Sequence, residues 1–570
     1  MNDNANMLAE KMMEELVAQL QSSHPSLREI PTFSSLPLIS ETMNHRNVGN
    51  AAIANGDYQK AYHEYSKGLI VNPNDPILWC NRAYALLKLG HPELAIVDAG
   101  RAINTIDQLH VDERNKFGLI MPTFGKERKD DLGYEERLIQ LKLKAKLREC
   151  QAYEKLNLLL HTQKSCVELL KWKEEYAEDN IPFQWWPEVT RLQIDSKKKY
   201  EEEYAKFGDE YKERIEKHGE WVFRGSYPWD RRQIHRVDDE IFQKLQKKIE
   251  DISSSQVNLV KDTFEELGNE PHYGLRAASD ISANTVIFEE TPFLCVNSKA
   301  KTRCDYCNKE LKTFKYPCPR SDCTEFFCDN KCYKQAYDLY HRLICGKDFT
   351  DITEVVKDEE TTSSLYHLFI IKLFAIGVLR NICPLDIEEI QHLRRWEHEN
   401  SSFTAISIEI YQKIMQILGI PQSDFNFDFW VYISCLSAIK SNVRTGTILT
   451  DSVSLYPLTS LVNHNCNPNA KLYIESDGSD ASSFTKIERN PQNYELFINP
   501  SAFLDRNAMP KAEFNTAELK TKEEIKKGNM ITINYVNFPE LDDEERCRML
   551  RNMCGIKCKC SKCSVQVGNV

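Results

Sequence analysis

Apolar and small residues recur at a fixed period in the first third of the chain. Gly56 and Gly90, like Ala61 and Ala95, are separated by 34 positions, and the apolar residues between them follow helical spacing. A small residue where two helices touch and a glycine at each turn are typical of stacked helical pairs. We therefore predict such pairs over residues 47–75, 77–107 and 138–170.

This period resembles that of the tetratricopeptide repeat (TPR), and the alternative is a helical bundle without repeats. We assign residues 46–175 to the repeat region, with an irregular insertion at 108–134. The resemblance implies a concave surface that docks a peptide or a protein partner.

Other helical and linking segments follow from charge and proline patterns. An amphipathic helix is predicted at residues 1–23, and a proline-bearing linker at 24–40 completes an N-terminal segment, 1–45. Interleaved opposite charges predict a solvated helix at 194–218. A second charged helix, 238–252, ends at three serines, so a domain boundary is expected there. The two charged helices, 194–218 and 238–252, belong to a charged helical linker region, 176–255.

The second half of the chain alternates between strand and helix patterns. Short β-rich runs around a glycine predict two small strands within 271–290. Helical spacing of apolar residues predicts core helices over 360–440. A Ser/Asp-rich surface loop is expected at 476–516, and the family resemblance given below implies another strand at 531–535.

Composition limits the class of protein. The 570 residues predict two to four domains, and 41% hydrophobic with 28% charged residues describe a folded protein. A formal net charge of -12 argues against long-range capture of nucleic acid, so no direct sequence-specific nucleic-acid binding is expected. No segment predicts a secretory signal or a membrane span. We expect a soluble monomer in the cytoplasm and nucleus.

Seven of the 19 cysteines lie between residues 304 and 345. Eight soft ligands in this segment match two tetrahedral zinc ions, and unligated buried thiols are the alternative. These ligands are Cys304, Cys307, Cys318, Cys323, Cys328, Cys332, His341 and Cys345. A segment this short could hardly fold without such metal cross-links.

A polar stretch, Asn463-His-Asn-Cys-Asn-Pro-Asn469, makes a poor core segment. Its proline cannot sit inside a helix, so a loop that presents side chains is expected. Two further features follow it: the strand ending at Tyr535, and the cysteines Cys558, Cys560 and Cys563.

The cysteine segment resembles a MYND finger, and the Asn463–Asn469 motif with Tyr535 resembles a SET domain. Their order along the chain is similar to that of the SET-and-MYND protein-lysine methyltransferases, in particular the TPR-bearing branch. The resemblance implies an α+β fold: a split β-rich SET domain with an inserted finger and a helical insert, preceded by helical repeats. It assigns the SET N-terminal part to 256–300, the MYND finger to 301–346, the helical insert to 347–440, the SET core to 441–545 and a zinc-binding tail to 546–570.

The resemblance also implies ligands and roles. In the finger, Cys304, Cys307, Cys328 and Cys332 would hold one zinc ion, and the other four ligands the second. A third ion would be held by Cys466, Cys558, Cys560 and Cys563. S-adenosylmethionine would be bound by Gly274, Asn442, Asn463, His464 and Tyr535.

The implied activity is transfer of a methyl group to a lysine side chain of a protein substrate. A free lysine has a pKa near 10.4, so an apolar channel must favour its neutral, nucleophilic form. Tyr535 would be the catalytic residue and would orient the amine at the end of that channel. The repeats and the finger would bind peptide or protein partners.

Three positions and one spacing depart from the family pattern. His272 replaces a glycine, Cys554 and Ile556 replace aromatic residues before the tail cysteines, and four residues instead of two separate Cys318 from Cys323. His272, Cys554 and Ile556 motivate an alternative function: a scaffold that binds peptides and whose SET core is weak or inactive.

Overall fold

A computed structural model gives the fold of the chain. The described residues are 36–111, 133–176, 182–218, 221–223, 227, 229–230, 239–263, 271–297, 303–311, 315–350, 352, 361–395, 402–404, 406–445, 452–474, 516–535, 545–547, 550 and 558. The predicted helix at 1–23 and nearly all of the predicted loop at 476–516 lie outside them.

The chain divides into two compact units. The first comprises residues 1–223 together with 402–430, and the second comprises 224–401 and 431–570. Residues 402–430 thus come from the middle of the stretch that the hydrophobic pattern assigns to one helical insert, yet they group with the N-terminal unit.

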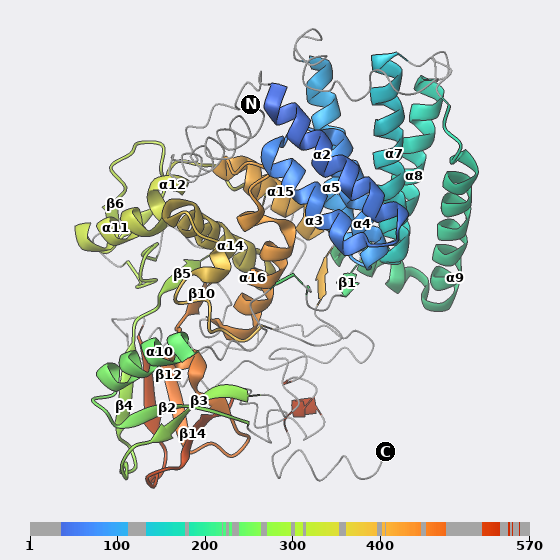
Figure 1. The fold of residues 1–570 in the computed structure, drawn as a ribbon. Helices are drawn as coiled ribbons and strands as arrows, with labels where there is room; N and C mark the ends of the chain where they lie inside the picture. The colour runs from blue at the N-terminus through green and yellow to red at the C-terminus, as the bar shows by residue number, and fades with distance from the viewer. Residues whose placement is uncertain are drawn as a thin grey trace. The chain divides into compact units, whose positions relative to one another are not determined.

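The N-terminal unit is a stack of antiparallel helices (Figure 1). They are α2 (Leu36–Ala54), α3 (Tyr58–Val71), α4 (Pro76–Leu89), α5 (Pro92–Val111), α7 (Tyr134–Lys155), α8 (Leu159–Glu175) and α9 (Trp186–His218). The three predicted helical pairs are confirmed, and so is the charged helix. Residues 36–40, expected in a linker, form the start of α2 instead.

Local sequence explains where these helices begin and end. Asp75 caps α4, since its carboxylate accepts hydrogen bonds from the backbone N–H groups of Ile77 (2.9 Å) and Leu78 (3.4 Å). Gly90 ends α4 with φ +79°, a conformation that favours glycine. The repeated Ala61 and Ala95 are fully buried, as a helix contact requires.

Residues 402–430 contribute β8 (Ser402–Thr404), α15 (Ile406–Leu418), the 3-10 turn Phe425–Phe427 and the start of α16 (Phe429–Asn442). Strand β8 pairs antiparallel with β1 (Trp221–Phe223), which belongs to the same unit. The pairing joins two segments that are about 180 positions apart in the sequence.

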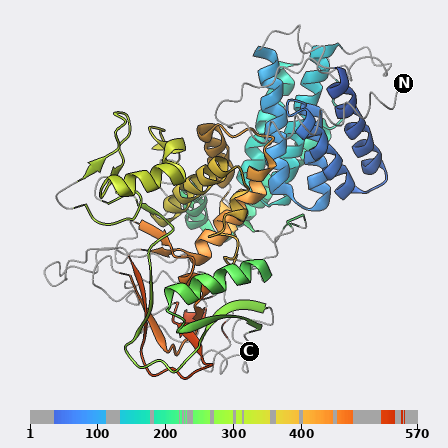
Figure 2. The same ribbon diagram turned by 60° about the vertical axis from the view of Figure 1, so that its left-hand side comes forward.

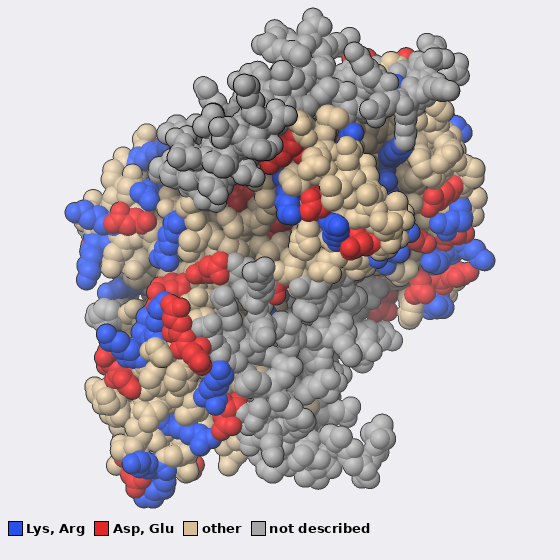
Figure 3. Space-filling model, in the orientation of Figure 1, with Lys and Arg blue, Asp and Glu red and all other residues tan. Residues whose placement is uncertain are grey.

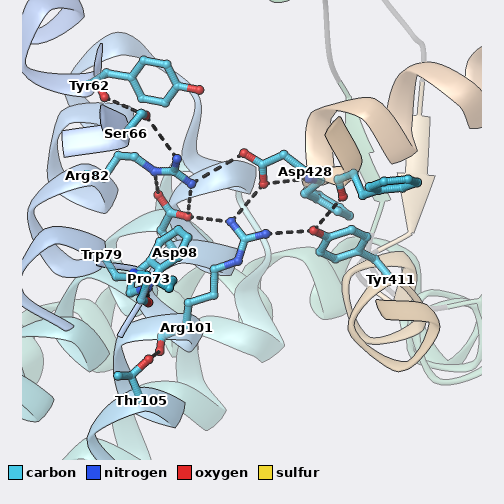
Figure 4. Close-up of polar contacts among 12 residues, drawn as sticks. Tyr62, Ser66, Pro73, Trp79, Arg82, Asp98, Arg101, Thr105, Tyr411 and Asp428 are labelled. Atoms are coloured by element: carbon cyan, nitrogen blue, oxygen red, sulfur yellow. Dashed lines mark hydrogen bonds and ion pairs between the residues drawn. The ribbon is translucent and has the colours of Figure 1, made fainter. Parts of the chain in front are cut away.

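A buried ion network fixes this segment to the repeats (Figure 4). Arg82 binds Asp98 through two hydrogen bonds of 2.7 and 2.8 Å, and Arg101 binds Asp428 at 2.9 Å. Arg101 also contacts Asp98 at 3.1 Å and donates to the Tyr411 hydroxyl at 2.8 Å. Burial alone would raise the pKa of Asp428, but Arg101 and Arg82 hold that pKa below its usual value. Two cations and two anions therefore neutralise each other inside the unit.

The second unit contains small sheets and helices. Its main elements are α10 (Asp239–Ile252), β2 (Val257–Thr263), β3 (Pro271–Ala277), β4 (Val286–Glu290), β5 (Leu294–Asn297), α14 (Thr361–Arg380), β9 (Arg444–Thr445), β10 (Ser452–Leu455), β11 (Asn463–His464), β12 (Ala470–Ile474), β13 (Ala517–Thr521) and β14 (Met530–Ile533). Both strands expected within 271–290 are confirmed as β3 and β4, and the expected helix before the three serines is α10. The strand expected at 531–535 is confirmed as β14, which ends two residues before Tyr535.

Three sheets are built from these strands, in the orders β11-β14-β3-β2, β12-β13-β4 and β5-β10-β9. Residues of β12 and β13 alternate between buried and half-buried, as strands with one face on a core do. Helix α10 packs over β2 and closes that core (Figure 2). The α+β class is confirmed.

The cysteine segment forms a compact subdomain. It comprises a hairpin of β6 (Tyr316–Pro317) and β7 (Phe326–Phe327), then α11 (Asn330–Ala336), a π-helical turn at Tyr337–His341 and α12 (Arg342–Ile344).

None of the described helices is both long enough and apolar enough to cross a membrane. Basic and acidic side chains are intermixed on the described surface seen in Figure 3.

Candidate active site and zinc centres

The Asn463–Asn469 motif is held by β14. Strand β11 pairs in parallel with β14, opposing Asn463 to Thr532 and His464 to Ile533. Because β14 also pairs with β3, three distant segments meet in one sheet. The motif, Tyr535 and the strand that carries Gly274 are therefore neighbours.

The imidazole of His464 links Tyr535 to Cys466. The backbone N–H of Tyr535 donates to His464 Nδ1 at 3.0 Å, so in the neutral ring the proton sits on Nε2. Nε2 lies 3.3 Å from Cys466 Sγ. The His464 ring is buried, and both of its nitrogens have partners within the chain. The ring therefore supports the backbone of Tyr535 and the thiol of Cys466.

Tyr535 lies beside this ring. Its hydroxyl donates to the carbonyl of Val462 at 2.6 Å, and its ring centroid is 5.3 Å from that of His464. The donated hydrogen bond fixes the direction of the hydroxyl. The phenol oxygen can still accept a hydrogen bond from a second group.

Asn463 faces the strand of Gly274. Its Nδ2 donates to the carbonyl of Tyr273 at 3.1 Å, whereas its Oδ1 has no hydrogen-bond partner among the described residues. Gly274 is buried opposite Val260. The amide oxygen of Asn463 and the adjacent glycine suit a ligand that carries hydrogen-bond donors.

Asn442 has a different environment. Its amide nitrogen donates to the carbonyls of Arg394 (2.6 Å) and Ala438 (2.8 Å) at the end of α16. Among the described residues, no hydrogen bond joins it to Asn463, His464 or Tyr535. Its predicted cofactor role stays a prediction.

Two residues without a predicted role hold the motif in position. The first is Asn469. Asn469 donates to the carbonyl of Met530 (2.7 Å) and accepts from the N–H of Thr532 (3.0 Å), which ties the end of the motif to β14. A double hydrogen bond from a carboxamide to a strand has no local sequence signal.

Glu290 holds the turn that precedes the motif. Its carboxylate accepts from the backbone N–H groups of Leu458 (2.8 Å) and Thr459 (2.7 Å) and from the Thr459 hydroxyl (2.7 Å). Burial raises the pKa of Glu290. Its signal in the sequence is the second of two carboxylates that end a strand whose first three residues are apolar.

The eight finger ligands form two clusters, in the interleaved grouping that the family resemblance implies. Cys304, Cys307, Cys328 and Cys332 form the first, and Cys318, Cys323, His341 and Cys345 the second. Tetrahedral zinc with bonds of about 2.3 Å separates sulfur atoms by about 3.8 Å. The structure has 3.5 Å between Cys307 and Cys328 and 3.5 Å between Cys318 and Cys345, so both clusters fit a zinc ion.

Helical geometry separates the two ligand clusters. Cys332 lies on α11 and His341 at the end of the π-helical turn, where Nε2 lies 3.4 Å from Cys318 Sγ. A π-helical turn changes the helical phase, and such turns are frequent at functional sites. The four residues between Cys318 and Cys323 form a turn closed by the Cys323 N–H and the Arg320 carbonyl (3.2 Å).

A nearby cysteine is not part of either cluster. Cys295 donates its thiol to the carbonyl of Tyr306 at 3.1 Å, and burial raises the pKa of that thiol. Lys372 of α14 reaches the same place and binds the Asp305 carboxylate at 2.6 Å. Through this buried ion pair, the finger is attached to the helix that follows it.

A third cluster lies at the motif. Cys466 and Cys558 sulfur atoms are 3.9 Å apart, and His464 completes a group of three possible ligands. The Cys pair fits zinc, whereas the His464 Nε2 that carries the proton suits a hydrogen bond to a thiolate. Cys560 and Cys563 lie outside the described residues, as do Cys554 and Ile556. His272 is buried at the start of β3.

Comparison with known families defines the class of domain. A SET-domain model matches residues 272–536, and a tetratricopeptide-repeat model matches residues 64–97. The chain therefore carries a SET domain and a tetratricopeptide repeat, and its cysteine clusters are consistent with a MYND finger inserted between the SET segments.

The relatives are distant. The chain is 22% identical over 241 residues to histone-lysine N-methyltransferase ASHR1 of Arabidopsis thaliana, covering 40% of this chain and 48% of that protein. It is 22% identical over 306 residues to histone-lysine N-methyltransferase Smyd1 of Mus musculus, covering 51% and 53%. A 64-residue stretch is 39% identical to DnaJ homolog subfamily C member 7 homolog of Schizosaccharomyces pombe, covering 10% and 13%. The chain is thus homologous to these methyltransferases at low identity and spans about half of their length.

Proposed function

We propose that the protein is an S-adenosylmethionine-dependent protein-lysine N-methyltransferase of the SET class. One observation carries the proposal: the motif is joined to Tyr535. Strands β11 and β14 pair in parallel, and the backbone N–H of Tyr535 donates a hydrogen bond to the imidazole of His464. Tyr535 lies 71 positions after His464, and hydrogen bonds hold both its backbone N–H and its hydroxyl.

The chain's own residues would orient the reactants. When bound, S-adenosylmethionine supplies a methyl group on a sulfonium centre. Asn463 Oδ1 would accept a hydrogen bond from its amino group, beside the bare backbone of Gly274. The Tyr535 oxygen, with its proton directed to Val462, would accept a hydrogen bond from the neutral lysine amine and hold that amine in line for transfer.

Labelled cofactor tests the proposal. Zinc-replete protein is incubated with S-adenosylmethionine labelled in the methyl group and a cell lysate, and labelled lysine is measured. Tyr535→Phe should lower transfer roughly 100-fold or more, because one positioned polar group at a reacting centre is lost. Tyr473→Phe, on β12, is the matched control and should retain activity. Absence of methyl transfer by the wild-type protein would refute the proposal. Equal transfer by Tyr535→Phe and Tyr473→Phe would also refute it.

A scaffold with a weak or inactive SET core is the second candidate. It is favoured by His272, which stands beside Gly274 in β3 where the family has a glycine. Calorimetry with S-adenosylmethionine separates the candidates. Tight binding that Asn463→Ala weakens at least tenfold supports the enzyme, and absence of binding supports the scaffold.

We further propose that the repeats recruit a protein partner through a carboxylate. On the first helices of the pairs, Asn50 accepts hydrogen bonds from Tyr65 (2.8 Å) and Asn81 (3.0 Å). Arg148 stacks on the Tyr84 ring at 4.4 Å, and its Nε is buried without a partner among the described residues. A guanidinium held this way favours a carboxylate of an incoming peptide.

Fluorescence anisotropy with an acidic octapeptide tests this partner chemistry. Binding should require the free C-terminal carboxylate and fall at least tenfold in Arg148→Ala. Lys155→Ala, an exposed lysine at the end of the same helix, should bind normally. Equal binding of the carboxylate and amide forms would exclude the proposed contact.

A further inference from the structure

A cavity of about 690 Å³ lies between α5 and the segment of α15 and its following turn. Both walls belong to the N-terminal unit. We call it the α5–α15 groove. Helix α5 is the second helix of its pair, whereas Asn50, Asn81 and Arg148 lie on first helices, so the groove is distinct from the carboxylate site proposed above.

The groove is lined by carboxamides. Asn104 and Gln108 project from α5, and Gln412, Gln416 and Gln422 from the opposite wall. Among the described residues, none of these five side chains is hydrogen-bonded to another part of the chain. A carboxamide carries a donor and an acceptor in one plane, which matches the N–H and C=O groups of a peptide backbone.

The charged groups of the lining are already neutralised. Arg101 is bound by Asp428 (2.9 Å) and Asp98 (3.1 Å), and Asp107 is paired with Lys142 at 2.8 Å. An anionic ligand would have to compete with Asp428 for Arg101. A ligand of either charge would lack an unpaired counter-charge, so the lining favours an uncharged ligand.

The floor is apolar and held in place. Val97, Met415 and Ile420 line it and are at most 5% exposed. In the same lining the Arg101 guanidinium donates to the Tyr411 hydroxyl (2.8 Å), which in turn donates to the Phe427 carbonyl (3.0 Å; Figure 4). These bonds join the two walls, so the groove exists before any ligand arrives, which lowers the entropic cost of binding.

Its length suits an extended chain. Val97 and Gln108 are eleven positions apart on α5, which corresponds to about 16 Å at 1.5 Å per residue. Five extended residues span a similar distance at about 3.3 Å each. Pockets of this volume are common for ligands, but a row of separate amides along a helix is better matched by repeated peptide groups than by one compact molecule.

We propose that the α5–α15 groove binds an extended, uncharged segment of about five residues from a protein partner. The backbone of that segment hydrogen-bonds to the row of carboxamides. One apolar side chain packs on Met415 and Ile420, and the unbranched methionine adapts to its shape. This site does not depend on methyl transfer.

End-blocked, fluorescein-labelled hexapeptides test the proposal with the full-length, zinc-replete protein. The neutral series alternates leucine with serine or glutamine, and matched series replace the leucines by glutamate or by lysine. Anisotropy should show binding of neutral peptides, with glutamate and lysine peptides at least tenfold weaker. Failure of every neutral peptide to bind, or a preference for either charged series, overturns the proposal.

Variants on both walls locate the site. Gln416→Trp on α15 and Asn104→Trp on α5 replace exposed amides by rings that fill the groove, and each should weaken binding at least tenfold. Gln59→Trp, at an exposed position on α3 outside the groove, should bind as the wild type does. Circular dichroism establishes that all three fold. Binding unchanged in either groove variant would place the peptide elsewhere and overturn the proposal.

Discussion

The two units solve the problem of buried polar groups in different ways. In the N-terminal unit, Arg82, Asp98, Arg101 and Asp428 neutralise each other with no added group. In the C-terminal unit, eight cysteine and histidine ligands converge in two clusters that are complete only with a cation. One unit should therefore depend on its own side chains, and the other on metal.

Zinc removal should give the largest effect and the sharpest contrast. Metal binding contributes on the order of 10 kcal/mol to the folding of a structural zinc site. A chelator should abolish hydrogen-exchange protection in peptides from residues 303–350, while peptides from 58–107 stay protected. Zinc added back should restore protection. Equal loss in both regions would contradict the contrast.

Loss of one charge from the ion network should destabilise the N-terminal unit instead of the finger. Asp428→Ala leaves Arg101 buried without its closest carboxylate, which should cost about 3–5 kcal/mol. Chemical denaturation, followed by exchange of α5 and α15, measures this. Asp107→Ala, whose carboxylate is half exposed and pairs with Lys142, is the control and should change stability little. A small effect at Asp428 would show that packing, and not charge, holds the segment.

A third kind of buried polar group, a neutral pair, should respond to pH. A hydrogen bond of 2.7 Å joins the Tyr432 hydroxyl to Nδ1 of His367, and burial lowers the pKa of His367 to about 3. The neutral ring stabilises the fold above its unfolded pKa of about 6.5, and this stabilisation is lost as pH falls toward 3. Between pH 7 and 5 the loss should reach about 2 kcal/mol.

The variant His367→Gln isolates the contribution of His367 protonation to stability, since a carboxamide does not titrate. Its unfolding free energy should fall less steeply with acid than that of the wild type. Parallel pH profiles of the two proteins would exclude His367 as the source.

The smallest expected effect is local. Asp75→Ala removes the cap of α4 and should destabilise the N-terminal unit by about 1 kcal/mol. Asp75→Asn retains the accepting oxygen and should recover most of the loss. An effect as large as that of Asp428→Ala would mean that Asp75 has a wider role than capping.

The site shows how far sequence reasoning reaches. The motif from Asn463 and the cysteine spacings are short-range patterns, and the structure brings the finger ligands into the grouping that the family resemblance implies. Short-range patterns do not identify the supports of the motif, Glu290 and Asn469, because their partners in the turn at Thr459 and on β14 are distant in the sequence. The cofactor role of Asn442 stays a prediction, and its amide nitrogen donates to the carbonyls of Arg394 and Ala438.

The sequence by itself determined the helical pairs, since periodicity and caps act within one or two turns, and the chemistry of the zinc ligands, since spacing and residue type are local. Only the tertiary structure decided that residues 402–430 join the repeats. Arg101 and Asp428 are 327 positions apart, and no local pattern encodes that pairing. Burial of both charges in one place selects it, because either charge alone would be too costly to bury.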